Sequence, residues 1–190
     1  VIVRRPEGRV FRGTDPTELA RELKGKGLLH SEARGKQMLF SFESGRWLGI
    51  HLGMTGALRA EQQSGYSTRK HDYLALEMSN GVVLVFEDQR LFGRIRFDLG
   101  QDAPEWWRRI PPSVTSKEFT RADVADFLQR RKRTPIKAVL LMQERFPGIG
   151  NWMADEILWR ARIAPHRRGG ALVDAEIQRL YKAVRWVAEK

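Results

Sequence analysis

The stretch Phe146–Asn151, with the sequence Phe-Pro-Gly-Ile-Gly-Asn, is the part of the chain that best indicates the fold. It leads directly into the apolar-periodic segment Trp152–Ile163, for which Asn151 is the predicted helix cap. Glycines at the start of a helix let the backbone approach a ligand closely, and the N–H groups and dipole of a helix N-terminus attract anions. The stretch therefore predicts a phosphate-binding turn in a helical domain. A plain tight turn between two helices is the alternative.

The second half of the chain, from about Thr115 onward, has the apolar periodicity of helices. Thr120 and Asp123 have the spacing of a capping box, and Pro135 suits the first turn of a helix that Thr134 opens. The predicted helices begin at Thr120, Thr134, Asn151 and Asp174, and the first two end near Arg130 and Gln143. Residues 113–190 are therefore predicted to form an all-helical domain.

The first half of the chain has the shorter pattern of β-strands separated by turns. Asn80-Gly81 is a strong hairpin signal, because both residues tolerate positive φ. One helix interrupts this half; Thr14 or Asp15 is its predicted cap, and Pro16 suits its first turn. The predicted strands are Gln37–Phe42, Arg46–Leu52, Tyr73–Met78, Val82–Glu87 and Arg94–Leu99. We expect residues 1–112 to form a β-sandwich with an inserted helix, incomplete at its N-terminus, in a chain of the α+β class.

The charge of the chain points to the kind of partner that it binds. Lys and Arg number 34 against 23 Asp and Glu, which leaves a net charge of +11. Such an excess favours a polyanion, either nucleic acid or an anionic membrane surface, and no run of about 18 apolar residues could span a bilayer. The lack of cysteine excludes disulfides, thiolate zinc sites and thiol nucleophiles from these residues, and the four histidines lack metal-ligand spacing. We therefore expect nucleic acid as the partner and no metal site.

A basic run, Arg130–Arg133, is followed by Lys137 in the next predicted helix. Consecutive cations at a helix junction repel one another unless an anion neutralises them. Phosphates do so with the release of counterions, which makes binding depend on salt. The run therefore favours contact with a nucleic-acid backbone, and a solvated charged face is the alternative.

Two turns of the strand-rich half carry residues that could enter a DNA duplex. His51–Gly56 places Met54 on a glycine-flanked turn, and Asp88–Gly93 carries Arg90 and Phe92. Residues two apart in an extended chain point the same way, so Phe92 could wedge between bases while Arg90 bonds to an orphaned base. For Met54 the alternative is core packing, and for the second turn it is an ordinary hairpin with a buried Phe.

These segments resemble the formamidopyrimidine-DNA glycosylase and endonuclease VIII family of base-excision enzymes, and they follow one another in the family's order. The resemblance runs from about Arg5 to Lys190. It rests on Arg34–Lys36, His51–Gly56, Lys70–Asp72, Ser79–Gly81, Asp88–Gly93, Thr134–Lys137 and Gly148–Glu156. It implies a β-sandwich joined to a helix–two-turn–helix domain, in agreement with the two periodicities. It also implies a DNA glycosylase with AP-lyase activity.

The resemblance implies roles for individual residues. Lys36 matches the lysine that lies beside the damaged nucleotide and assists strand cleavage. Met54, Arg90 and Phe92 match the three residues that fill the space left by a flipped base. Four residues match contacts to the DNA backbone: His71, Lys132, Lys137 and Asn151, the last on the phosphate next to the lesion. Glu156 matches an acidic residue at the helix start with a structural role.

The chain departs from the family pattern in three places. Family members begin with Pro-Glu, whose proline amine attacks C1′ of the sugar. Pro6-Glu7 cannot do this, because an internal proline nitrogen is an amide. The resemblance implies that the nucleophile lies upstream of Val1 and that zinc is held by a finger beyond Lys190; we expect these ends to be missing from the sequence, and a natural non-catalytic relative is the alternative. Leu91 replaces an arginine that is common in the insertion loop.

The expected function is excision of oxidised bases from double-stranded DNA by a monomeric, cytoplasmic, nucleoid-associated bacterial protein that binds no membrane. The set of Met54, Arg90 and Phe92 favours oxidised purines, meaning 8-oxoguanine and formamidopyrimidines, over pyrimidines. A helix-hairpin-helix glycosylase is a rival suggested by Pro147–Gly150, but it predicts all-helical surroundings. A non-enzymatic lesion-binding or architectural protein is the second rival.

Overall fold

The computed structural model describes residues 2–190, which fall into two compact units that meet between Arg108 and Arg109. The predicted boundary, after residue 112, lies a few residues further along the chain. Each unit has its own buried core, so each is described by itself. No helix among residues 2–190 is long and apolar enough to cross a membrane.

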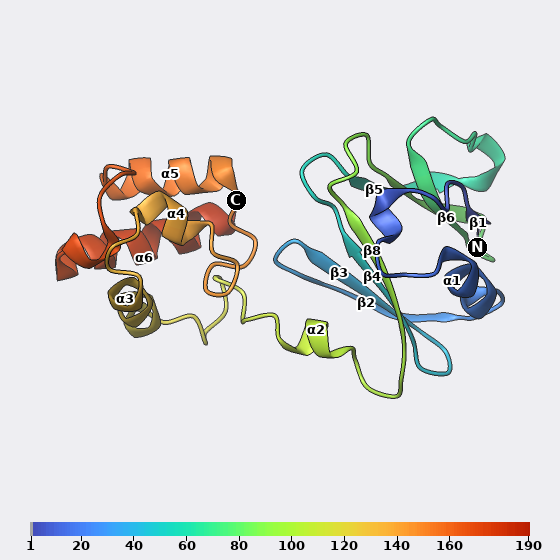
Figure 1. The fold of residues 1–190 in the computed structure, drawn as a ribbon, viewed down its shortest axis with the longest axis horizontal. Coiled ribbons are helices and arrows are strands. Elements are labelled where there is room, and N and C mark those ends of the chain that lie inside the picture. The colour runs from blue at the N-terminus through green and yellow to red at the C-terminus, as the bar shows by residue number, and fades with distance from the viewer. Residues whose placement is uncertain (1) are drawn as a thin grey trace. The chain divides into compact units, whose positions relative to one another are not determined.

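Within residues 2–108 the chain forms two four-stranded antiparallel sheets (Figure 1). The first has the order β1-β6-β7-β5, with strands Ile2–Val3, Asp72–Glu77, Val82–Glu87 and Ala57–Gln62. The second has the order β2-β3-β4-β8, with strands Leu28–Arg34, Gln37–Phe42, Arg46–His51 and Arg94–Leu99. The remaining elements are helices α1 (Pro16–Leu23) and α2 (Glu105–Arg108) and the short turns η1 (Arg9–Phe11) and η2 (Gln63–Gly65).

Apolar side chains of both sheets meet in one core, as expected of a sandwich. Leu48 and Ile50 of β4 pack in the same cluster as Leu74 of β6 and Phe86 of β7. Helix α1 adds Leu19 and other buried residues to this cluster. The predicted β-sandwich with one inserted helix is confirmed.

The cap of α1 explains where that helix begins. The carboxylate of Asp15 accepts hydrogen bonds from the backbone N–H groups of Thr17 at 2.8 Å and Glu18 at 3.3 Å, and Pro16 stands in the first turn. Asp15 therefore satisfies two of the free donors of the helix. Of the two caps predicted from the sequence, Asp15 is the one used.

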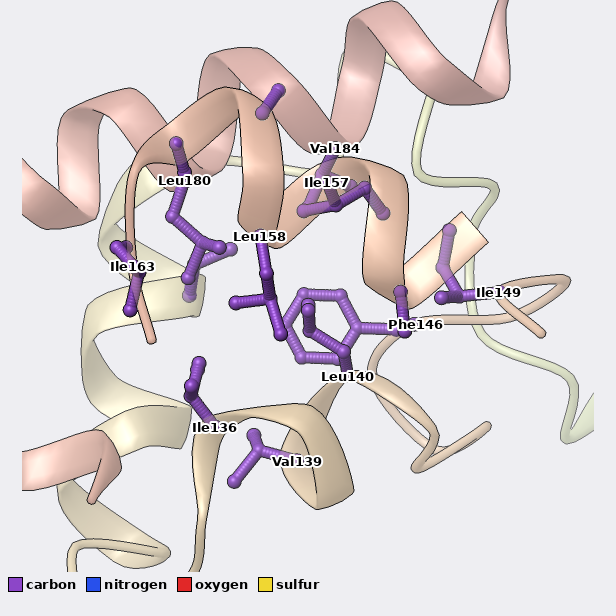
Figure 2. Close-up of a cluster of buried hydrophobic side chains, with 14 of the residues drawn as sticks. Ile136, Val139, Leu140, Phe146, Ile149, Ile157, Leu158, Ile163, Leu180 and Val184 are labelled. Atoms are coloured by element: carbon purple, nitrogen blue, oxygen red, sulfur yellow. The ribbon is translucent and has the colours of Figure 1, made fainter. Parts of the chain in front are cut away.

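The second unit is helical, as predicted, and surrounds Phe146. Its elements are α3 (Arg121–Arg130), α4 (Ile136–Leu140), α5 (Asn151–Ala161), η3 (Gly169–Ala171) and α6 (Asp174–Ala188). Figure 2 shows Phe146 within a cluster to which α4, α5 and α6 contribute side chains. The rings of Phe119 and Phe127 lie edge-on to it, with centroids 5.9 and 6.1 Å away. This core fixes the turn that precedes α5, because Phe146 begins that turn.

Several helix boundaries differ from the prediction, and one of them is the end of α5 at Ala161 in place of Ile163. Helix α4 ends at Leu140, earlier than the expected Gln143. Asn151 and Asp174 are the first residues of their helices, and the capping positions are Gly150 and Val173. In α6 the carboxylate of Glu176 accepts the N–H of Val173 at 3.0 Å. The carboxylate of Asp174 pairs instead with Arg121. The side chain of Asn151 is likewise not used as a helix cap.

Candidate nucleic-acid interface

The buried carboxylate of Asp88 joins two loops of the first unit. One loop connects β4 to β5 and carries Met54; the other connects β7 to β8 and carries Arg90 and Phe92. Asp88 accepts hydrogen bonds from the Thr55 hydroxyl at 2.9 Å, the Arg90 N–H at 3.2 Å and the Gly93 N–H at 2.7 Å. A fully buried carboxylate is stable when donors surround it, and here the donors come from both loops.

Glycine lets the backbones of the two loops touch. Gly53 has φ +68°, and a Cβ there would lie 2.6 Å from the carbonyl carbon of Phe92 and from the nitrogen of Gly93. A Cβ on Gly93 would lie 2.7 Å from the ring of Phe86 and 2.9 Å from the carbonyl oxygen of His51. A larger residue at either position would push the loops apart.

The predicted insertion residues project from these loops. Met54 is 72 % exposed and Phe92 47 % exposed, so the alternatives of a buried Met and a buried Phe are wrong. The guanidinium of Arg90 lies 4.7 Å from the centroid of the Phe92 ring. The sequence predicted that Arg90 and Phe92 point the same way because the chain is extended. The structure brings them together differently, since Leu91 between them has φ 59° and the chain forms a turn there. Large exposed apolar side chains side by side mark an interaction surface.

Lys36 stands in the turn between β2 and β3, beside a pocket of about 320 Å³ that Met54 also lines. His51, the last residue of β4, pairs with Gln37 across the sheet and is therefore close to Lys36. Burial, and next the positive charges of Lys36 and Arg96, lower the pKa of His51 below 6.5. The Nδ1 atom of His51 accepts the Gly53 N–H at 3.0 Å, which leaves Nε2 as the N–H of the neutral ring.

The sequence alone gives no role to the side chain of His51, because the residue precedes the Gly-Met-Thr-Gly turn and has no motif of its own. Its proximity to Lys36 depends on the pairing of β3 with β4. His71 was predicted to lie near DNA. Its carbonyl oxygen accepts the Asp88 N–H at 3.1 Å, so the structure brings it to the base of the Arg90 loop.

In the second unit, Gln143 shapes the turn before α5. Its amide nitrogen donates to the carbonyl oxygen of Ile149 at 2.9 Å, and its amide oxygen accepts the Gly148 N–H at 3.0 Å. Gly148 has φ 90°, a conformation that favours glycine. Asn151 is exposed at the end of this turn, and among residues 2–190 its side chain has no hydrogen-bond partner. The arrangement leaves an amide group at a helix N-terminus available to a ligand.

The basic residues of this unit are partly paired. Lys137 forms an ion pair of 2.7 Å with Asp155, one turn after Asn151 on α5, so the structure brings Lys137 to the start of that helix. Arg131 pairs with Glu144 at 2.7 Å, whereas Lys132 is exposed and has no ion pair within the described residues. The basic run therefore keeps part of its charge unpaired among residues 2–190.

Asp155 and its neighbour Glu156 differ in what they bind. Glu156 pairs with Arg160 at 2.7 Å along α5, a contact that supports the structural role expected of it.

Across residues 2–190, no three His, Asp or Glu side chains gather as a metal-ion site.

Comparison with known proteins decides the family. The sequence model of the formamidopyrimidine-DNA glycosylase N-terminal domain matches residues 1–95, and that of the formamidopyrimidine-DNA glycosylase H2TH domain matches residues 110–190. The chain belongs to the formamidopyrimidine-DNA glycosylase family. Its two units are thus the family's N-terminal domain and its helix–two-turn–helix (H2TH) domain.

Relatives in this family share about a third of the sequence. A formamidopyrimidine-DNA glycosylase of Chloroflexus aurantiacus is 38 % identical over 176 residues, which are 92 % of this chain and 62 % of the relative. The MutM (Fpg) crystal structure of Thermus thermophilus is 34 % identical, with a TM-score of 0.80 over 99 % of this chain and 66 % of its own. The chain thus spans less than two thirds of the length of these relatives.

A third relative was solved with a damaged nucleic acid. This formamidopyrimidine-DNA glycosylase of Lactococcus lactis is non-covalently bound to DNA that contains an AP site. It is 26 % identical, with a TM-score of 0.87 over 99 % of this chain and 71 % of its own.

Proposed function

We propose that the protein is a DNA glycosylase of base-excision repair that also cleaves the strand at the resulting abasic site. The observation that carries this proposal is the loop pair joined by Asp88, which presents Met54, Arg90 and Phe92 together. Of these, Met54 also lines the pocket beside Lys36. Membership of the glycosylase family and the relative bound to AP-site DNA support it.

The loop pair is suited to a duplex from which one base has been turned out. Turning a base out costs a few kcal/mol of stacking and pairing, and an inserted side chain offsets part of that cost. Phe92 is the wedge between neighbouring bases, Met54 fills the space that the base leaves, and Arg90 donates to the base that has lost its partner. The contact of Arg90 with the Phe92 ring holds both side chains ready before DNA arrives.

Other residues hold the backbone. Asn151, Lys137, Lys132 and His71 bind phosphates, and Lys36 lies beside the damaged nucleotide, where an ammonium group stabilises the charge that develops as a phosphate leaves. Asn151 suits its role because its amide is exposed at the N-terminus of an 11-residue helix. The +11 charge of the chain agrees with a polyanionic partner.

The substrate we propose is an oxidised purine, 8-oxoguanine or a formamidopyrimidine, opposite cytosine. An arginine guanidinium offers paired donors, and the edge of an orphaned cytosine offers acceptors that no longer have a partner. A MutM relative solved with DNA containing carbocyclic 8-oxo-G supports this choice.

Borohydride trapping tests the proposal. The protein, together with the segment that the family resemblance places upstream of Val1, is incubated with three duplexes, which carry 8-oxoguanine opposite cytosine, thymine glycol opposite adenine, or an abasic site, and each adduct is weighed. We expect an adduct with the 8-oxoguanine and abasic duplexes and a weaker one with thymine glycol. A stronger adduct with thymine glycol would overturn the purine preference. Binding without any adduct would leave a non-catalytic lesion-binding protein.

A further inference from the structure

Two arginines of β8 lie on the outer face of their sheet. Ile95 between them is fully buried in the sandwich core, so Arg94 and Arg96 point the opposite way. Arg94 pairs with His51 of β4 and Arg96 with Gly49, which places the two guanidinium groups on the same face as His51.

A third arginine approaches this pair from the turn after η1. The Nη1 atom of Arg12 donates to the carbonyl oxygen of Gly93 at 3.2 Å. The next residue, Gly13, lies so close to Arg94 that a Cβ there would be 3.2 Å from its Nη2 atom. Arg12 and Arg94 therefore meet at the start of β8.

Acidic groups do not balance this cluster. Within residues 2–190 none of Arg12, Arg94 and Arg96 has an ion pair, and the buried Nε of Arg94 lacks a hydrogen-bond partner. Three other arginines have a buried, unpartnered side-chain nitrogen, but each holds a carboxylate through another nitrogen: Arg46, Arg59 and Arg145. Arg94 thus differs from those three arginines, because no carboxylate pairs with any of its nitrogens within residues 2–190.

Asp98, two residues after Arg96 on the same face of β8, is an acid whose charge acts on Arg96. Its Oδ2 accepts the indole N–H of Trp106 at 3.0 Å. Burial lowers the pKa of Arg96, and the positive charge of Arg94 is the next largest cause of this lowering. The charge of Arg12 lowers the pKa further, whereas the negative charge of Asp98 raises it. At Arg96, therefore, the repulsion from Arg94 exceeds the attraction of Asp98.

We propose that Arg12, Arg94 and Arg96 form a phosphate subsite that takes a backbone phosphodiester of DNA, in addition to the contacts of Lys36, His71 and the H2TH domain. This inference rests on the proposed function for the identity of the ligand. A guanidinium group suits a phosphate because its planar donors match two oxygens, and here Arg12 is exposed while Arg94 and Arg96 are only partly buried. Trp106 holds Arg96 in place, since the guanidinium lies 4.5 Å from the centroid of the indole ring.

The salt dependence of DNA binding tests the subsite. The double variant Arg94→Gln, Arg96→Gln is compared with the parent protein on a lesion-free duplex from 50 to about 300 mM salt. We expect affinity to fall about tenfold and the slope of log K against log salt to lose about one unit, as for one phosphate contact. The control is Arg21→Gln on α1, an exposed arginine beside Glu22, which pairs with Arg46 at the opposite end of β4 from His51. The Arg21→Gln control should keep nearly the full slope of log K against log salt.

A second measurement separates binding from folding. Because the cluster repels itself, the free double variant should unfold at the same or a higher temperature than the parent. A slope and affinity equal to those of Arg21→Gln would overturn the subsite, and so would a lower melting temperature that accounts for the weaker binding. Borohydride trapping remains independent: a lost slope in a protein that forms no adduct would keep the subsite and reject the enzyme.

Discussion

The hydroxyl of Thr55 donates to the carboxylate of Asp88 at 2.9 Å, across 33 residues of sequence. Asp88 also accepts the N–H groups of Arg90 and Gly93, so this one hydroxyl ties the Met54 loop to the loop that carries Phe92. The relationship makes the two loops a single unit, which presents Met54, Arg90 and Phe92 in a fixed arrangement.

Replacing Thr55 with Val should uncouple the loops while keeping the shape of the side chain. We expect a loss of about 1.5–3 kcal/mol of folding free energy, the usual value of one hydrogen bond to a charged group. Met54→Ala and Phe92→Ala should then act additively on excision from duplex DNA, whereas in the parent they should couple by more than 0.5 kcal/mol, roughly the limit for independent sites. A double-mutant cycle in both backgrounds measures this, with Thr55→Ser as the control that keeps the hydroxyl. Equal coupling in both would contradict the role of Thr55.

Removing the ring of Phe92 should harm work on duplex DNA more than work on single strands, because only a duplex has a gap to fill. Phe92 is 47 % exposed, so stability should change little. The measurement is the rate of excision from the two substrates, with Leu29→Ala as a control for loss of an exposed apolar side chain in the same unit. We expect at least a tenfold larger loss on duplex, since stacking is worth about 1–3 kcal/mol per base. Equal losses would exclude a wedge.

The elements that the sequence predicted well depend on local signals. Asp15 and the Thr120–Asp123 capping box act on backbone groups of their own first turns, and β7 has the pattern of a central strand with Asn80-Gly81 before it. Strands β2 (Leu28–Arg34) and β5 (Ala57–Gln62) were not predicted. Both are edge strands with many exposed polar residues, so their alternation of apolar and polar residues is weak.

In the candidate site, too, residues in short local segments could be predicted, whereas contacts between distant segments could not. Met54, Arg90 and Phe92 could be named from their turns and from a family resemblance, because each lies in a short recognisable segment. Asp88 could not be given its role, since its partner Thr55 comes from another loop. The environment of His51 depends on strand pairing as well. The alternation of apolar and polar residues along β4 does not reveal which cations of the neighbouring strands face His51.

The depressed pKa of His51 gives a stability change with a definite sign. Because the folded-state pKa lies below 6.5, the unfolded chain binds the proton more readily. This contribution to stability is complete above about pH 6.5 and is lost as the pH falls toward the folded-state value. His51→Asn removes the titration and keeps an oxygen that can accept the Gly53 N–H. Melting curves from pH 7.5 to 5 should therefore fall less steeply for the variant, and parallel curves would contradict the shift.

Truncating Asn151 to Ala should weaken binding to all DNA sequences alike, because a phosphate contact carries no base information. We expect a loss of about 10- to 150-fold, since one hydrogen bond to a charged group is worth about 1.5–3 kcal/mol. The slope of affinity against salt should stay the same, since an amide is neutral and its loss releases no counterion. Gln129→Ala removes an exposed amide from α3 and serves as the control. Binding isotherms on two unrelated duplexes measure both quantities. Unchanged affinity for Asn151→Ala, or a loss confined to one duplex, would show that this amide does not hold a phosphate.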